Sequence, residues 1–344
     1  MRNKYIHEIF YKDLNFLDGY ESFCYQNCQR LLLESQGFEY PELYINTALS
    51  FSYNIKNDDI YSVYGSRSLL PSLETNVKRL YFDDKLEMVT EVFMQNLEYI
   101  DKNELPIIVG VDTFFLEYAI NYQKNHAIHT LIMCGYDLDK SEIYVIDWYK
   151  PWLFKGTVKL EDFLKARNSL NPFDGTMFSG EPIRNNWAFI DSLTPLSADQ
   201  LFKELINTTI HNYYEKDEND YIFKGIEALH LVKDRLLSSE DTNLFKDFYF
   251  KLLKISKRYK LFKESLLSYR NLSQNNKEIE LLEETLKTLQ DLINFWDILL
   301  MVILKGSMKL SDKTKERLTN NFNSLIENEE KLKTNLYELN KGAA

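Results

Sequence analysis

Cysteine is scarce in this chain: the 344 residues include three, at positions 24, 28 and 134. An odd count this small does not make a disulfide framework, so we expect free thiols and a reducing, cytoplasmic compartment. Each of these thiols is then either buried in a core or available for chemistry. The question for the sequence is which of the three is placed to react.

Long apolar runs and an excess of basic charge are also missing. The longest apolar stretch, residues 293–304, contains Asp297 and is shorter than the ~20 residues of a membrane span. The first apolar segments are interrupted by charges, which does not fit a signal peptide. Lys and Arg number 41 against 52 Asp and Glu, a net charge of −11, whereas nucleic-acid binding needs a basic surface. We therefore expect neither a membrane nor a nucleic acid as partner.

Glycine and proline become rare after about residue 194, and this change in composition predicts two domains. Residues 1–193 mix strand and helix signals, which predicts an α+β domain with an antiparallel sheet. Residues 194–344 show helical periodicity and predict an α-helical bundle. Its clearest apolar stripe runs from Ile279 to Leu300, and we expect Gly306 to end that helix.

The N-terminal part contains recognisable elements. We expect helices at 24–35 and 85–99, strands at 106–112, 128–136, 142–147 and 187–190, and a polar turn at 137–141. Because the two strands at 128–136 and 142–147 share that short turn, they should pair as an antiparallel hairpin.

Three residues in this part form a possible catalytic set. Cys24 begins a helical stretch, where free backbone N–H groups and the positive end of the helix dipole favour a thiolate. His129 opens an apolar strand, and a base held there is rigid. Asp147 ends the next strand, from which it would orient the imidazole and stabilise its charged form. The hairpin would bring the histidine and the aspartate together.

Other arrangements of the same residues remain open. Cys28 lies one helical turn after Cys24 and is an alternative nucleophile. Cys24 and Cys28 with His126 and His129 would supply four zinc ligands, but an odd separation on a strand points the histidines to opposite faces. We predict no metal. The three residues could also be a buried thiol, a hydrogen-bonded histidine and a turn aspartate with no shared role.

Three segments resemble the butirosin-biosynthesis H-protein N-terminal family. They are residues 23–37, with a glycine thirteen positions after Cys24, residues 105–118, and residues 129–147 with a Gly-Tyr-Asp turn between two strands. The resemblance covers about residues 15–190. A relative of similar type forms amide bonds in the closthioamide pathway.

The resemblance implies a papain-like fold with Cys24 as nucleophile, His129 as base and Asp147 as orienting group. It also implies an acyltransferase in natural-product biosynthesis, which moves an acyl or peptidyl group from a carrier-protein thioester to an amine. The implied partner is an acyl or peptidyl carrier protein. No cofactor is expected on this chain, because the substrate rides on the phosphopantetheine arm of the carrier.

Several side chains were considered for substrate contact. Phe114, Phe115 and Tyr118 could line the site and exclude water, and Asp112 could bind an amine, although core packing and a structural hydrogen bond are the alternative roles. The second oxyanion donor stays unassigned, because Asp18, six residues before Cys24, is a carboxylate that would repel an oxyanion. A hydrolase on the same triad and a non-catalytic carrier- or peptide-binding module are the rival functions.

Overall fold

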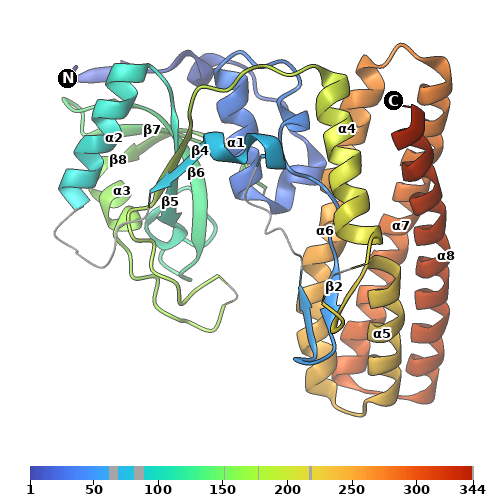
Figure 1. The fold of residues 1–344 in the computed structure, drawn as a ribbon. Helices are drawn as coiled ribbons and strands as arrows, with labels where there is room; N and C mark the ends of the chain where they lie inside the picture. The colour runs from blue at the N-terminus through green and yellow to red at the C-terminus, as the bar shows by residue number, and fades with distance from the viewer. Residues whose placement is uncertain (62–68, 81–88, 151, 177, 217–218, 343–344) are drawn as a thin grey trace. The chain divides into compact units, whose positions relative to one another are not determined.

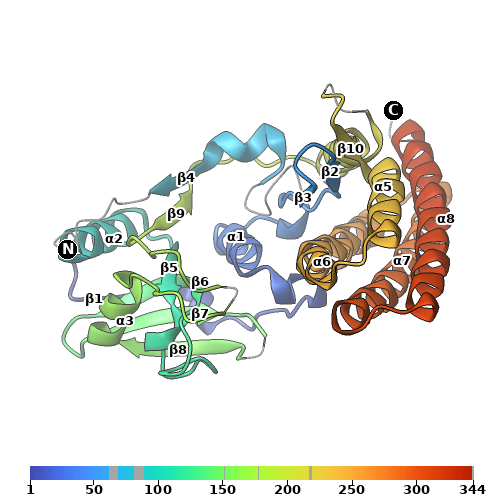
Figure 2. The same ribbon diagram turned by 90° about the horizontal axis from the view of Figure 1, so that it is seen from below.

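The protein divides into two compact units (Figures 1 and 2). A computed structural model describes residues 1–61, 69–80, 89–150, 152–176, 178–216 and 219–342. Unit 1 comprises Met1–Ile45 and Ser66–Pro195, and unit 2 comprises Asn46–Gly65 and Leu196–Ala344. The architecture is mixed α+β with antiparallel sheets and a C-terminal helical region, as the sequence predicted at that level.

Unit 1 is built on one antiparallel sheet. Its strands follow the order β4-β9-β5-β6-β7-β8, and β1 also pairs with β6. The strands are β1 (Lys4–Ile6), β4 (Val77–Leu80), β5 (Ile107–Asp112), β6 (Ile128–Asp137), β7 (Glu142–Asp147), β8 (Phe154–Lys159) and β9 (Trp187–Ile190). The helices are α1 (Cys24–Ser35), α2 (Val89–Asn103) and α3 (Leu160–Arg167), with 3₁₀ turns at Glu8–Tyr11, Asp18–Ser22, Pro41–Leu43, Pro71–Asn76 and Thr113–Phe115.

The core of unit 1 lies between the sheet and the helices α2 and α3. Alternate residues of β5 and β6, such as Val109 and Leu131, face Phe93 of α2 and Phe163 of α3 in one buried cluster. This alternation is the period-two pattern of a sheet that buries one face against helices. Helix α1 lies on the other side of the strands (Figure 2).

The predicted strands and the hairpin of β6 and β7 are confirmed, with the turn between them at residues 138–141. The first predicted helix, at 24–35, also matches α1. The second differs, because α2 covers Val89–Asn103, and residues 85–88 of the predicted range lie outside the described residues.

Helix α1 begins without a side-chain cap. Phe23 occupies the N-cap position and makes no capping hydrogen bond, and no acidic residue lies in the first turn. The helix ends at a glycine: Gly37 has φ +82°, and Phe38 N–H donates to the Leu33 carbonyl, the pattern of a left-handed helix end. No capping side chain from the described residues therefore occupies the start of the helix beside Cys24.

Unit 2 is dominated by three long helices that run side by side (Figure 1). They are α6 (Thr242–Leu272), α7 (Asn276–Met308) and α8 (Asp312–Gly342), and they pack with α4 (Ala198–Thr209), a π-helical turn (Ile210–Tyr214) and α5 (Gly225–Ser238). A small sheet has the order β10-β2-β3, from Ile222–Lys224, Ser52–Asn54 and Asp59–Tyr61. In the described part of the chain, none of the helices is both long enough and apolar enough to span a membrane.

The division of the chain differs from the predicted boundary in one segment. Residues 46–65 were assigned to the N-terminal domain, but they belong to unit 2. The reason is pairing: β2 forms an antiparallel ladder with β10, and Arg258 of α6 donates to the carbonyls of Asn46 and Ala48. These contact partners are so distant in sequence that no local sequence pattern predicts the pairing.

The expected stop of the long helix at Gly306 is wrong. Helix α7 continues through this glycine to Met308. A Cβ at position 306 would lie 2.6 Å from Cδ1 of the buried Phe245 ring, so the glycine serves close packing between α6 and α7.

A buried carboxyl group lies inside unit 2. Glu329 of α8 is fully buried and accepts hydrogen bonds from the hydroxyl groups of Tyr259 and Tyr214, and the Tyr259 hydroxyl in turn contacts that of Tyr213 at 2.6 Å. Burial raises the pKa of Glu329 to about 7, although the tyrosine hydrogen bonds act in the opposite direction.

The raised pKa predicts a pH-dependent stability of unit 2. The folded state holds the Glu329 proton more tightly than the unfolded chain, so the free energy of unfolding should fall as pH rises between about 4.5 and 7. In the wild-type protein, this titration should make the free energy of unfolding about 2–3 kcal/mol lower at pH 7 than at pH 4.5. We expect Glu329→Gln to lack this difference. Urea denaturation of both proteins across this range measures it, and equal pH slopes would contradict the assignment.

Candidate active site

The register of the sheet brings His129 and Asp147 to the same place. Residues 132 and 133 of β6 pair with 146 and 145 of β7, so Asp147 is level with Leu131. His129 follows two positions along β6 and points to the same face as Leu131. A diagonal neighbour at this spacing is within reach of a long side chain. The predicted meeting of these two residues is present in the structure.

Asp147 is the best-anchored side chain of this group. His129 Nε2 lies 2.8 Å from its Oδ1, the Tyr118 hydroxyl donates to Oδ2 at 2.9 Å, and Trp152 Nε1 donates to the same Oδ2 at 2.7 Å. Asp147 and His129 are both buried. With three partners on two oxygens, the carboxylate is fixed in orientation, and it fixes the imidazole in turn.

The Cys24 thiol interacts with His129 through charge and a side-chain hydrogen bond, and both change the pKa values of the two groups. Because Nε2 is engaged by Asp147, Nδ1 is the ring nitrogen left for the thiol. Burial alone would raise the pKa of Cys24, but the His129 charge and hydrogen bonds with His129 and Thr130 lower it below its usual value. For His129, burial acts to lower the pKa, while the charges of Asp147 and Cys24 raise it more. Both shifts favour a thiolate–imidazolium pair.

The surroundings of Cys24 suit a nucleophile. The thiol is half-buried and begins α1, whose first turn has no capping side chain. The positive end of this helix can therefore stabilise a developing negative charge on a substrate carbonyl oxygen. One short segment supplies both the reactive sulfur and part of its stabilising environment.

The other two thiols are in different environments. Burial and the nearby Cys24 charge raise the pKa of Cys28 well above its usual value, and its Sγ lies 3.6 Å from the Thr130 carbonyl oxygen. Burial likewise raises the pKa of Cys134, which lies within β6 and contacts the Tyr144 carbonyl oxygen. Both should remain thiols at neutral pH, so the geometry favours Cys24 over Cys28 as the nucleophile.

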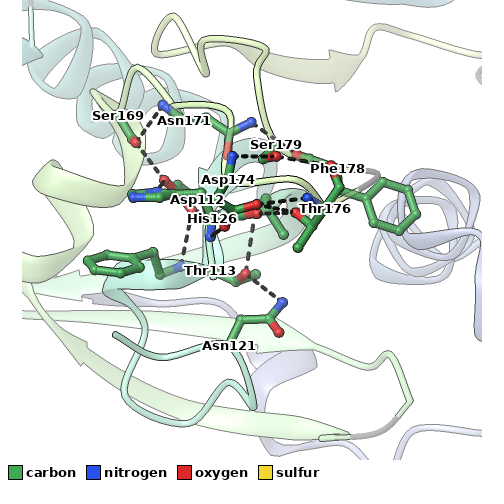
Figure 3. A network of polar contacts seen from close by, with 12 residues as sticks. Asp112, Thr113, Asn121, His126, Ser169, Asn171, Asp174, Thr176, Phe178 and Ser179 are labelled. Atoms are coloured by element: carbon green, nitrogen blue, oxygen red, sulfur yellow. Dashed lines mark hydrogen bonds and ion pairs between the residues drawn. The ribbon is translucent and has the colours of Figure 1, made fainter. Parts of the chain in front are cut away.

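A second polar network surrounds Asp112, the residue considered for amine binding (Figure 3). Asp112 is fully buried, and its oxygens accept from the backbone N–H groups of Phe114 and Ala127 and from the Ser169 hydroxyl. His126 Nδ1 is 2.7 Å from Oδ2. With these four contacts, the carboxylate has little capacity left for a substrate amine. Its observed role is to tie the loop containing Ser169 to β5.

The three aromatic residues considered for substrate contact lie in different places. The Phe114 ring stacks on His126 with centroids 4.2 Å apart. Phe115 packs against the core of unit 1 and borders a groove of about 700 Å³, also beside His126. Of the three, only Tyr118 contacts the set formed by Cys24, His129 and Asp147, through its hydrogen bond to Asp147. Its role there is positioning.

The two histidines of the zinc alternative are hydrogen-bonded to different carboxylates, His126 to Asp112 and His129 to Asp147. Across the residues that the structure describes, no group of three or more His, Cys, Asp or Glu side chains is arranged to hold a metal ion.

Sequence reasoning missed two residues of the site, Trp152 and Tyr149. Their rings pack against the His129 ring, with centroids 5.5 Å and 5.0 Å from it. The usable signal was the β-ladder register, since continuation of the β6–β7 pairing beyond Asp147 places position 149 opposite His129. Apolar composition alone gave no reason to choose these aromatic residues among the many in the chain.

No known protein family matches this chain, and no curated protein matches it either.

The lowered pKa predicts selective alkylation. At about pH 7, iodoacetamide should modify Cys24 and leave Cys28 and Cys134 unmodified in the folded protein, as read by peptide mass spectrometry. In His129→Ala, the thiol loses its cationic partner and keeps its burial, so we expect the Cys24 rate to fall at least about tenfold. An unchanged rate in this variant would contradict the ion pair.

The support of Asp147 can be tested separately. Tyr118→Phe removes one donor to Oδ2 but keeps the ring that stacks on Phe154 at 3.8 Å. A hydrogen bond to a charged group contributes about 1.5–3 kcal/mol, so the carboxylate should hold His129 less firmly. We expect a several-fold slower alkylation of Cys24 with an unchanged circular dichroism spectrum. Wild-type reactivity would show that Trp152 alone suffices.

Proposed function

We propose that the protein is an acyltransferase that forms amide bonds through an acyl-enzyme on Cys24. The single observation that carries this proposal is the contact chain from the Cys24 thiol through His129 to Asp147. Such a chain of nucleophile, base and orienting carboxylate is the arrangement of acyl-transfer enzymes. A papain-like fold for unit 1 belongs to the same proposal, supported by a helix that begins at the cysteine and an antiparallel sheet that carries the histidine.

The donor in this proposal is an acyl or peptidyl thioester on the phosphopantetheine arm of a carrier protein. The Cys24 thiolate adds to the thioester carbonyl, and collapse of the tetrahedral intermediate breaks the bond to the carrier sulfur. The carrier thiolate then takes the proton from the His129 imidazolium, which leaves an acyl-Cys24 thioester and a neutral His129. Exchange between two thioesters is nearly balanced in energy, so no cofactor is required to drive it.

The acceptor is an amine. Its nitrogen attacks acyl-Cys24, the neutral His129 accepts the proton, and Cys24 leaves as a thiolate paired with the imidazolium. The rings of Tyr149 and Trp152 pack against His129, and Tyr118 packs against Trp152. These rings support an amine acceptor over water, because water must be limited near the acyl-enzyme.

A hydrolase on the same three residues is the second candidate. It is favoured by the half-buried state of Cys24, since a thiol open enough for a carrier arm is also open to water. The two functions share the acyl-enzyme and differ only in what attacks it.

The test uses intact-protein mass spectrometry after incubation with an acyl-pantetheine thioester. We expect a mass increase by the acyl group in wild type and in Cys28→Ala, and none in Cys24→Ala. Addition of a primary amine should discharge the adduct and yield an amide. Discharge to the free acid at the same rate with and without amine would identify a hydrolase, and absence of any adduct in wild type would favour a non-catalytic binding module.

A further inference from the structure

The proposed reaction needs more than one donor for the oxyanion. When Cys24 adds to a carbonyl, negative charge develops on the carbonyl oxygen, and acyl-transfer sites stabilise it with two or more converging hydrogen bonds. The first turn of α1 supplies backbone N–H groups from one side. Asp18, six residues before Cys24, cannot serve as the other donor: it is a carboxylate, it is 64% exposed, and it lies 3.8 Å from Lys150 Nζ.

Three aromatic side chains with a proton to donate surround the Asp147–His129 pair. The Tyr118 hydroxyl and Trp152 Nε1 both donate to Asp147 Oδ2, so neither is free for a substrate. Tyr149 differs, since among the described residues its hydroxyl has no hydrogen-bond partner. The free donor of this group is therefore the Tyr149 hydroxyl.

Tyr149 is held firmly beside the reacting groups. Its ring centroid lies 5.0 Å from that of His129 and 5.7 Å from that of Trp152, and the ring is half-buried. Its backbone carbonyl accepts from the N–H groups of Trp152 and Leu153, which closes a turn directly after β7. Thus both the backbone and the ring are fixed, as a stabilising donor requires.

Burial and the nearby charges keep the Tyr149 phenol protonated. Burial, followed by the charge of Cys24 and then those of Asp147 and Glu21, raises the pKa of Tyr149 to about 12. At neutral pH the group is therefore a neutral donor, and its ring lies beside that of His129.

We propose that Tyr149 is a catalytic residue, whose hydroxyl donates a hydrogen bond to the oxyanion formed when Cys24 adds to the acyl carbonyl. This inference rests on the proposed function. In the step concerned, the sulfur lone pair forms the C–S bond, the carbonyl π electrons move to oxygen, and the phenol keeps its proton while it donates. The same contact forms again when the amine attacks acyl-Cys24.

The experiment compares two reactions of the same sulfur. Acylation by an acyl-pantetheine thioester passes through an oxyanion, whereas alkylation by iodoacetamide is a displacement at a saturated carbon and does not. Single-turnover acylation, read by quenched mass spectrometry, is measured beside alkylation in wild type, Tyr149→Phe and Tyr144→Phe. The last variant removes a hydroxyl from β7 away from Cys24 and controls for general effects on the sheet.

We expect Tyr149→Phe to slow acylation about 100-fold, the usual effect of the loss of one oxyanion donor, with an alkylation rate within about twofold of wild type. Tyr144→Phe should match wild type in both reactions. Wild-type acylation in Tyr149→Phe would overturn the inference and leave the proposed function intact. An equal fall in both rates would also overturn it, because Tyr149 would then act on the thiolate. A wild-type protein that is alkylated but never acylated would refute the proposed function itself.

Discussion

The rest of the site depends on the coupling between the Cys24 thiol and His129, which lowers the pKa of the thiol and raises that of the imidazole. A half-buried thiol would ordinarily hold its proton more tightly than in water, because burial disfavours a thiolate. The imidazolium reverses this preference, and the Asp147 carboxylate makes the imidazolium possible in a buried position. The charge of Cys24 therefore depends on His129, and that of His129 depends on Asp147 and Cys24.

The sheet and the aromatic residues give this pair its geometry. The β6–β7 ladder sets the distance between the histidine and the aspartate, and Tyr118 and Trp152 prevent the carboxylate from rotating. Trp152, one of the two donors to Asp147, also packs against the His129 ring and limits water there. The aromatic residues that support the base therefore also limit the access of solvent to it. This would serve the proposed acyl-enzyme, which must react with an amine before it reacts with water.

Much of unit 1 could be predicted from local patterns. The helix at Cys24, the strands and the hairpin follow from hydrophobic periodicity and a five-residue polar turn, and the hairpin in turn predicts the contact between His129 and Asp147. Local patterns were insufficient where a residue's contact partners are distant in the sequence. For Asp112 the sequence left both amine binding and a structural hydrogen bond open. The structure shows the hydrogen bonds, and one of their donors, Ser169, lies 57 positions away. A glycine such as Gly306 suggests a helix end, and the Phe245 ring that instead requires it is on another helix.

Nitrogen NMR of the His129 ring can show whether the thiolate–imidazolium pair exists in the resting protein at neutral pH. We expect both ring nitrogens to carry a proton at about pH 7, and the ring to become easier to deprotonate in Cys24→Ala, where the negative partner is missing. A neutral His129 with a single protonated nitrogen at this pH, and no change in Cys24→Ala, would contradict it.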